Sequence, residues 1–261
     1  MLSLLQQFYL LGAGDFYLEF ISCVEDTFIT NRDEISDGWF QEVFSHCVNN
    51  TSLASTSDYI AQHLHLNRLH HLSVFDIWKT PFFSIDKEPN LAVIFTQSVM
   101  AKYELIFGFL MNLRTQSLIL ERIWTDQCWL EKELDRLVDP LLRKQLRQVL
   151  DQFNLLRVKI HSFLTTLQSF YYLHIIDKLY KKMIMKIQEV DEFDGIIECH
   201  KEFIDNLSHF VFVDSSETVI NQQIVELVAL SKKFVGIQNK LFETIYTLLD
   251  KVNVWNTREI G

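Results

Sequence analysis

The sequence predicts an all-α protein built from bundles of long amphipathic helices, with at most one short extended segment. Glycine and proline are scarce, with 7 and 3 residues in a chain of 261, so few positions can interrupt a helix. Hydrophobic residues make up 48% of the chain and include 21 Phe, which is ample material for a buried core. No alternation of strands with helices is visible, which argues against a nucleotide-binding sheet. One large helical domain or two small ones are therefore expected.

The first segment, FYLLGAGDFYLEF (residues 8–20), places Gly12 and Gly14 inside a dense apolar run. Glycine costs about 1 kcal/mol in a helix interior relative to alanine, so the pair predicts a turn between two helices. Glycine tolerates positive φ, which lets the chain reverse after the first helix. Asp15 is then expected to cap the following helix. A backbone bare of side chains can also be approached closely by a partner, so a helix C-cap and a contact site both remain open.

Residues 31–95 form the least regular region, because Ser, Thr, Asn, Asp and Pro interrupt it. NNTSLASTSD, starting at Asn49, is expected to be an exposed loop. FFSID, residues 82–86, is expected to be a short strand or extended segment. HLHLNRLHH, residues 63–71, holds four histidines without the converging Cys or acidic ligands that zinc needs, so a partly exposed helix or loop is favoured over a metal site.

From residue 98 onward, apolar residues recur every three or four positions, which predicts long helices. The first is expected over roughly residues 99–124, with an N-cap in Thr96-Gln-Ser98. Pro140 is expected to open the next helical run, which continues to Ile187 as one kinked helix or two in tandem. EVDEFDG ends that run, and a short helix and the capping sequence Asp214-Ser-Ser-Glu217 precede the last helix. Its apolar face is predicted to contain Ile224, Leu227, Phe234, Ile237, Leu241, Ile245, Leu248 and Val252.

The formal net charge of −10 argues against a general affinity for nucleic acid or anionic membranes. Residues 1–101 carry −8, residues 102–186 carry +5 and residues 187–261 carry −7. Such blocks indicate either a site for an acidic partner or helices that pair their charges within the chain, and the second is favoured. No apolar stretch of about 18 residues exists, so no membrane insertion is expected. Four dispersed cysteines fit reduced thiols in the cytosol.

Catalysis is not indicated by any residue pattern. Asp191, Glu192 and Asp194 could suggest a magnesium site, but such a site needs a second acidic cluster facing the first. The Gly-Ala-Gly turn lacks the Lys-Ser/Thr of a phosphate-binding loop. No Ser or Cys nucleophile stands in a recognisable elbow. The residues therefore predict a binding module without enzyme activity, metal or cofactor. Most of its aromatic side chains are expected in the core, and the exposed ones are the candidates for holding another protein.

Five segments, in a fixed order, resemble the C-terminal half of gamma-tubulin complex proteins. LLQQFYLLGAGDFYLEFI is similar to the F-Y-L-L-G-x-G-D-F turn of that family. EPNLAVIF and the helix after it are similar to the family's W-P-L segment and its Y-x-x-I-F-x-x-L-L-x-L-[KR] helix, which closes on Trp124. FLTTLQSFYYLHIIDKLY, EFDGIIECHKEFIDNL and the final helix complete the match over nearly the whole chain. The chain departs at Glu88, Thr166 and Tyr180, where the family has Trp, Asn and Trp.

The resemblance implies one helical gamma-tubulin-binding domain over residues 1–261, with the family's N-terminal half absent. It implies that gamma-tubulin and other gamma-tubulin complex proteins are partners, in a non-catalytic scaffold for microtubule nucleation in which any GTP belongs to gamma-tubulin. Localisation to the cytoplasm and cytoskeleton, at a microtubule organising centre or spindle pole, follows from the same resemblance. The candidate contact residues are Phe8, Leu11, Gly12, Gly14, Asp15, Phe16, Pro89 and Leu91. A helical tethering subunit of membrane traffic is the alternative, since such rods share this composition without requiring the GAGDF turn.

Overall fold

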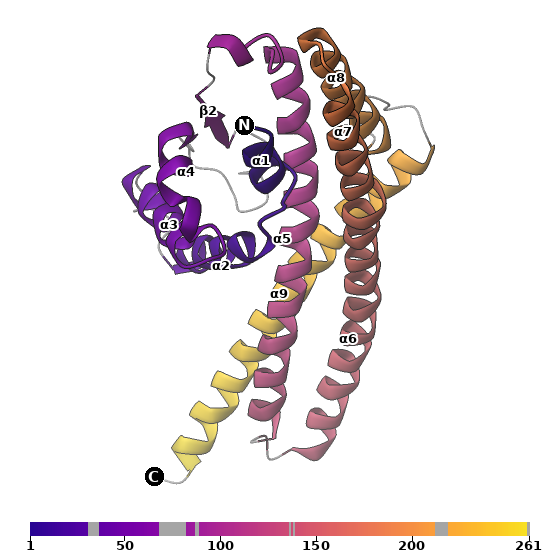
Figure 1. Ribbon diagram of the computed structural model, residues 1–261. Helices are drawn as coiled ribbons and strands as arrows, with labels where there is room; N and C mark the ends of the chain where they lie inside the picture. Colours follow the sequence, from indigo (N-terminus) through magenta and orange to yellow (C-terminus); the bar gives the residue numbers. More distant parts are fainter. Residues whose placement is uncertain are drawn as a thin grey trace. The chain divides into compact units, whose positions relative to one another are not determined.

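The computed structural model describes residues 1–30, 37–67, 82–86, 89–135, 137, 139–211 and 219–259. Most of these residues are helical, which confirms the predicted all-α class (Figure 1). The chain divides into two compact units. Unit 1 comprises Met1–Thr115 and Ser169–Ser216, and unit 2 comprises Gln116–Gln168 and Glu217–Gly261. Among the described residues, no helix combines the length and the apolar character needed to cross a bilayer.

Unit 1 begins with short elements around an aromatic core. In chain order these are α1 (Leu2–Leu4), the π-helical turn η1 (Leu5–Tyr9), α2 (Gly14–Thr30), α3 (Asp37–Asn49), η2 (Ala54–Thr56), α4 (Ser57–His63), β1 (Leu64–Leu66), β2 (Phe83–Ile85) and η4 (Pro89–Leu91). Rings from η1, α2, α3 and β2 meet in this core, for example Phe8 with Phe16, Phe44 and Phe83 at centroid distances of 5.4 to 5.9 Å. Edge-to-face ring pairs add to the stability gained from burying apolar area.

The segment NNTSLASTSD is exposed at most positions, as predicted, but it is not one irregular loop. α3 continues to Asn49, Leu53 is buried, and α4 begins at Ser57 within the segment. The hydroxyl of Thr51 donates to the main-chain oxygen of Cys47 at 2.7 Å, which closes the end of α3. Thr51 therefore closes the end of α3, whereas η2 and α4 begin without a side-chain cap.

β1 and β2 form a two-stranded antiparallel sheet in which Leu64 pairs with Ile85 and Leu66 with Phe83. β2 confirms the predicted extended segment at FFSID. In the histidine-rich segment, β1 is a strand where a helix or loop was expected. The alternation of Leu64, His65 and Leu66 covers only three residues, which is too short to predict a strand. His65 instead faces Asp86 across the sheet, with Nε2 2.9 Å from Oδ2. His70 and His71 lie outside the described residues.

The rest of unit 1 is built from the start of α5 (Gln97–Leu134) and from η5 (Phe170–Ile176), α7 (Asp177–Glu189) and α8 (Phe193–Phe210). The predicted N-cap of α5 is confirmed, since the N–H of Val99 donates to Oγ1 of Thr96 at 3.3 Å. His200 of α8 is buried, and its Nε2 lies 3.0 Å from the hydroxyl of Tyr103 in α5. This bond ties α8 to the first third of α5.

Opposite charges in unit 1 pair between helices, as the charge blocks predicted. Lys182 and Lys186 of α7 both contact the carboxylate of Glu202 in α8. Lys102 of α5 lies 2.8 Å from Asp205, also in α8. Within unit 1, three lysines from the basic middle of the sequence thus pair with two carboxylates from its acidic last third. These pairs are surface-exposed, so each contributes only about 0 to 1 kcal/mol.

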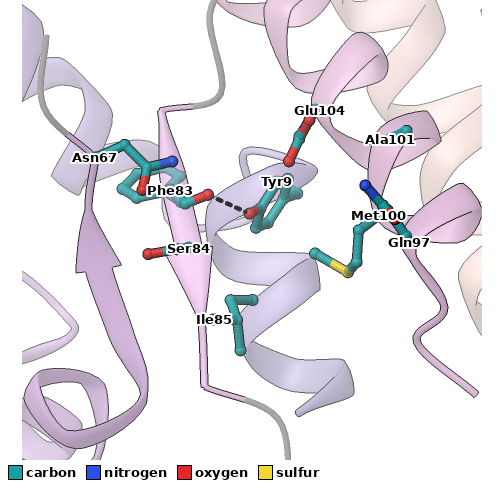
Figure 2. Close-up of a pocket in the computed structure, with 9 residues that line it drawn as sticks. All are labelled: Tyr9, Asn67, Phe83, Ser84, Ile85, Gln97, Met100, Ala101 and Glu104. Atoms are coloured by element: carbon teal, nitrogen blue, oxygen red, sulfur yellow. Dashed lines mark hydrogen bonds between the residues drawn. The ribbon is translucent and has the colours of Figure 1, made fainter. Parts of the chain in front are cut away.

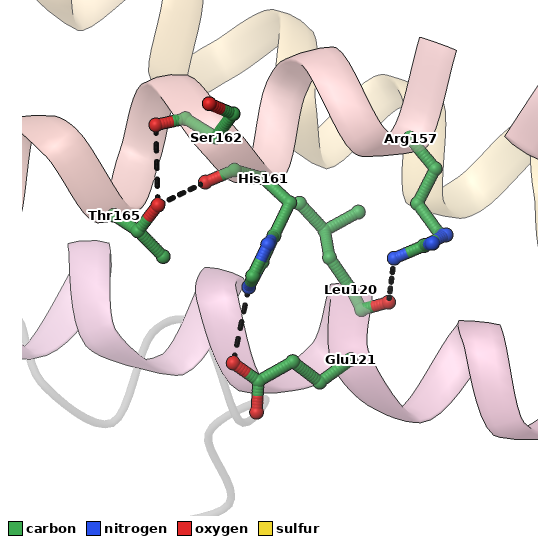
Figure 3. Close-up of polar contacts among 6 residues, drawn as sticks. All are labelled: Leu120, Glu121, Arg157, His161, Ser162 and Thr165. Atoms are coloured by element: carbon green, nitrogen blue, oxygen red, sulfur yellow. Dashed lines mark hydrogen bonds and ion pairs between the residues drawn. The ribbon is translucent and has the colours of Figure 1, made fainter. Parts of the chain in front are cut away.

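Unit 2 contains the rest of α5, α6 (Pro140–Ser169) and α9 (Val219–Glu259). Pro140 opens α6 as predicted, and Oδ1 of Asp139 accepts the N–H of Leu141 at 2.8 Å. Figure 3 shows how α6 binds α5: Arg157 donates to the main-chain oxygen of Leu120 at 3.3 Å, and His161 lies 3.0 Å from Glu121. The Arg157 guanidinium also stands 5.0 Å from the ring centre of Trp124.

The helical run from Pro140 contains no loop. α6 ends at Ser169, η5 begins at Phe170 and α7 begins at Asp177, so the two alternatives resolve into one helical path that includes a π-helical segment. EVDEFDG ends this path as predicted, because α7 stops at Glu189 and α8 starts at Phe193. The predicted capping sequence Asp214-Ser-Ser-Glu217 lies outside the described residues.

The buried face of α9 differs from the predicted one. Leu227 and Ile237 are 44% and 56% exposed, whereas Phe234 and Ile245 are buried as expected. Apart from Phe234, the buried positions have three-and-four spacing: Val228, Ser231, Val235, Gln238, Phe242, Ile245 and Leu249. Two of these residues are polar, and apolar residues also occupy the neighbouring face of α9. A pattern based on hydrophobicity alone therefore does not identify the buried face. Ser231 is held inside by donating its hydroxyl hydrogen to Gln116 of α5.

Candidate partner-binding turn and the adjacent pocket

The turn predicted in the segment 8–16 lies between the end of η1 at Tyr9 and the start of α2 at Gly14. The N–H of Leu10 donates to the oxygen of Leu5 at 3.1 Å, that of Gly12 to Gln6 at 2.9 Å, and that of Ala13 to Gln7 at 3.2 Å. These bonds satisfy carbonyl groups at the helix end that would otherwise lack partners. Because η1 is π-helical, each of these N–H groups bonds to a carbonyl one residue farther back in the chain than at an ordinary helix terminus. α2 then begins at Gly14, so the chain reverses within four residues.

Neither glycine of the turn has positive φ, which corrects the predicted reason for their presence. Among the described residues, Leu11 alone combines a side chain with positive φ, at 56°. Gly12 is required for a different reason: a Cβ there would lie 2.8 Å from the main-chain oxygen of Gln6. A Cβ on Gly14 would meet no atom within 4 Å. The packing of the turn therefore requires glycine at position 12, whereas a larger residue would fit at position 14.

Asp15 lies inside the first turn of α2 rather than at its N-cap, which corrects its predicted role. Its Oδ2 accepts the N–H of Ser52 at 2.7 Å, and its Oδ1 accepts the Ser52 hydroxyl at 3.0 Å. The bond from the Ser52 N–H is the main reason why the pKa of Asp15 is lowered. The carboxylate thus fastens the segment after α3 beside the turn, and its charge suits a helix N-terminus.

The eight predicted contact residues fall into three groups. Phe8 and Phe16 are fully buried, with ring centres 5.4 Å apart, and form the floor beneath the turn. Leu11, Gly12, Gly14 and Asp15 are partly or fully exposed and form its outer surface. Pro89 and Leu91 belong to η4, where Pro89 is exposed and Leu91 half-buried. The structure thus brings six of the eight together at one turn and gives the remaining two to a separate element.

A pocket of about 400 Å³ lies between β2 and the start of α5 (Figure 2). Tyr9, directly after the buried Phe8, forms one of its walls and donates its hydroxyl hydrogen to the oxygen of Phe83 at 3.0 Å. Burial, with a smaller contribution from the Glu104 carboxylate, raises the pKa of Tyr9 well above its usual range, so the hydroxyl stays a donor. The remaining lining residues are Asn67, Ser84, Ile85, Gln97, Met100 and Ala101.

The pocket was not predicted from the sequence. Tyr9 and Phe83 are far apart along the chain, and β1 was expected to be helix or loop, so nothing local connected the two walls. Its polar groups are one carboxylate, amides and hydroxyls, all of which can form hydrogen bonds. No three His, Cys, Asp or Glu side chains anywhere in the described part of the chain gather to hold a metal ion.

Comparison with known proteins matches residues 1–253 to the family described as gamma tubulin complex component C-terminal. The chain is 24% identical over 233 residues to gamma-tubulin complex component 3 of Homo sapiens, which covers 85% of this chain and 25% of that protein. The Xenopus laevis homolog of component 3 is 23% identical over 222 residues (84% and 24%), and the Arabidopsis thaliana component 3 is 20% identical over 249 residues (94% and 29%). The chain thus spans about a quarter of the length of these relatives. Because the family match covers almost the whole chain, this protein belongs to the gamma-tubulin complex component family and corresponds to its C-terminal region.

Proposed function

We propose that this chain binds gamma-tubulin and positions it within a microtubule-nucleating complex, without catalysing a reaction. The match of residues 1–253 to the C-terminal model of gamma tubulin complex components carries this proposal. A scaffold that holds gamma-tubulin in a fixed pose lowers the entropy lost when the first tubulin subunits assemble. Residues 1–261 act as one binding domain in this proposal, and other gamma-tubulin complex proteins are further partners.

The proposed contact surface is the outer side of the turn, at Leu11, Gly12, Gly14 and Asp15. Leu11 holds a left-handed backbone conformation that costs an L-residue roughly 1 to 2 kcal/mol, although its side chain stays partly exposed. Strained residues of this kind cluster where a side chain serves a ligand or partner. A leucine at this position supports a role for its side chain outside the fold. Pro89 and Leu91 of η4 remain further candidates.

Gly14 supports the same surface for a complementary reason. It is exposed, and space is open where its side chain would be, so a partner can approach the main chain there. Phe8 and Phe16 contribute from beneath, by fixing the turn on the aromatic core. The proposed surface thus consists of a bare backbone, one strained leucine and one carboxylate on a rigid base.

Localisation to the cytoplasm and cytoskeleton, at a microtubule organising centre or spindle pole, is part of the proposal because a gamma-tubulin-binding module acts where microtubules start. The family is one of structural complex components, which supports a scaffold rather than an enzyme. The membrane-traffic alternative has no comparable support, since its helical rods do not require the GAGDF turn.

The proposal is tested by co-precipitation of the purified chain with gamma-tubulin at near-physiological salt. We expect the unaltered chain to retain gamma-tubulin and Gly14→Val to retain at least tenfold less. Gly236→Val is the matched control, because Gly236 in α9 is also exposed and open around its Cβ position. Failure of the folded, unaltered chain to retain gamma-tubulin contradicts the function. Equal retention by Gly14→Val contradicts the proposed surface.

A further inference from the structure

Two of the four cysteines, Cys23 in α2 and Cys47 in α3, face each other in unit 1. α2 and α3 pack with their backbones within 8 Å of each other. Cys47 is fully buried, and its thiol is hydrogen-bonded to the thiol of Cys23. Glu19, one turn before Cys23 on the same helix, also acts electrostatically on the Cys47 thiol. Cys47 therefore points at the α2 face that carries residues 19 and 23.

Aromatic packing fixes this arrangement. Phe20 of α2 and Phe44 of α3, each three residues before its cysteine, lie in edge-to-face contact with centroids 6.5 Å apart. Phe16 meets the same Phe44 ring at 5.5 Å. Both pairs belong to the buried core, so the helices cannot turn their cysteines apart without breaking ring contacts.

We propose that Cys23 and Cys47 form a thiol pair that low-molecular-weight disulfides oxidise to a disulfide bond between α2 and α3. In the first step the thiolate of the half-buried Cys23 attacks the oxidant RS–SR, forming a mixed disulfide and releasing RS⁻. In the second step the Cys47 thiolate attacks the Cys23 sulfur and releases the second RS⁻. The two protons lost by the cysteines protonate the two leaving groups, so two thiols are oxidised and one disulfide is reduced.

The order of attack follows from exposure. Burial raises the pKa of the Cys47 thiol to about 12, so at neutral pH very little of it is thiolate. Cys23 is partly exposed and can meet an oxidant in solution. Closure by Cys47 is then the slow step, and it accelerates as the pH rises toward 9 because more thiolate forms.

Cys128 and Cys199 provide internal controls. Both are partly exposed, like Cys23. Among the described residues they lie near charged side chains, Cys128 near Arg157 and Cys199 near Lys186. Exposure to the same oxidant therefore tests whether thiol proximity or accessibility decides which bond forms.

The experiment treats the reduced chain, residues 1–261, with oxidised glutathione at pH 8, followed by peptide mapping without reductant. We expect a Cys23–Cys47 cross-linked peptide, lighter by two hydrogen atoms, at least ten times as abundant as any link to Cys128 or Cys199. The oxidised chain is expected to unfold about 5 °C higher, because the link restricts the unfolded chain. Cys23→Ala, at the less buried position, is expected to abolish both effects.

Two results would overturn the proposal. One is glutathione retained on Cys23 with Cys47 still alkylatable at pH 9, because the pair would then be unable to close. The other is a set of links distributed evenly over all four cysteines, because accessibility would then decide the outcome. Both are read from the unaltered chain, so they hold whether or not the Cys23→Ala variant folds.

Discussion

The hydroxyl of Tyr9 donates to the main-chain oxygen of Phe83 at 3.0 Å and joins the start of the chain to β2. The bond lies between the proposed contact turn and the pocket at the start of α5, and Tyr9 also has ring contacts of 5.9 Å with both Phe83 and Tyr103. One side chain thus fixes η1 to β2 and to α5. The residue that precedes the turn is thus anchored to two other elements of unit 1.

Tyr9→Phe is expected to lower the free energy of unfolding by about 1 kcal/mol. The variant keeps the ring contacts and removes only the buried hydrogen bond, whose net contribution is of that size. Chemical denaturation measures the loss. Tyr172→Phe, at a largely exposed tyrosine in η5, is the control and is expected to change the free energy by less than 0.5 kcal/mol. Equal effects of the two variants would show that the Tyr9 bond does not stabilise the fold.

Leu11→Gly and Leu11→Ala are expected to separate stability from binding. Glycine removes the cost of the left-handed conformation, whereas alanine keeps it, so the glycine variant should be more stable by about 1 kcal/mol. Both lack the leucine side chain, so both should bind gamma-tubulin at least tenfold more weakly. Thermal unfolding and equilibrium binding measure the two effects. Unchanged affinity of both variants would restrict the role of Leu11 to the fold.

Because His200 is buried, we expect the protein to lose stability in mild acid. Burial lowers the pKa of His200 to about 4, below the value of about 6.5 in an unfolded chain. Between these values the unfolded state binds a proton that the folded state does not, so stability is full above pH 6.5 and falls as the pH drops toward 4. The loss contributed by His200 approaches about 3 kcal/mol near pH 4.

Denaturation of the unaltered chain and of His200→Phe at pH 7 and pH 4.5 tests this prediction. The Phe variant loses the Tyr103 bond and should be less stable at pH 7, with a smaller further loss at pH 4.5. His174→Phe, at an exposed histidine, should keep the pH dependence of the unaltered chain. An identical pH dependence in His200→Phe would mean that other groups account for the acid sensitivity.

Gln238→Leu is expected to stabilise unit 2. Gln238 is fully buried in α9, and both atoms of its amide group lack a hydrogen-bond partner among the described residues. Leucine removes the desolvated amide at similar volume, which should raise the free energy of unfolding by about 1 to 2 kcal/mol. Gln116→Leu is the matched contrast: it breaks the bond from Ser231 and should lower the free energy. Destabilisation by both variants would indicate that Gln238 is satisfied by water or by a partner.

The starts of the long helices were predictable because each depends on local signals, whereas α5 continues to Leu134, beyond the end expected near residue 124. α5 has a polar cap at Thr96, α6 begins at Pro140, and an acidic break separates α7 from α8, all of which are visible in the sequence. The three-residue strand β1 was not, since its stability comes from pairing with a segment about 20 residues later. The buried face of α9 was assigned only in part, because Ser231 and Gln238 lie in the core, where polarity misleads a hydrophobic pattern.

The position of the turn was predictable, but its details were not. Two glycines in an apolar run located the turn, yet the left-handed residue is Leu11, because the π-helical η1 shifts the end of the helix by one position. Ser52 as the partner of Asp15, and Phe83 as the partner of Tyr9, are tertiary contacts that no local pattern contains. Sequence reasoning therefore found the surface of the turn and missed what holds it.

Hydrogen exchange of the chain, alone and with saturating gamma-tubulin, tests the central claim most directly. The account predicts slower exchange of main-chain amides over residues 10–15 in the complex, with residues around Gly236 unchanged. Exchange that stays the same along the whole folded chain at saturating gamma-tubulin would contradict the proposed binding.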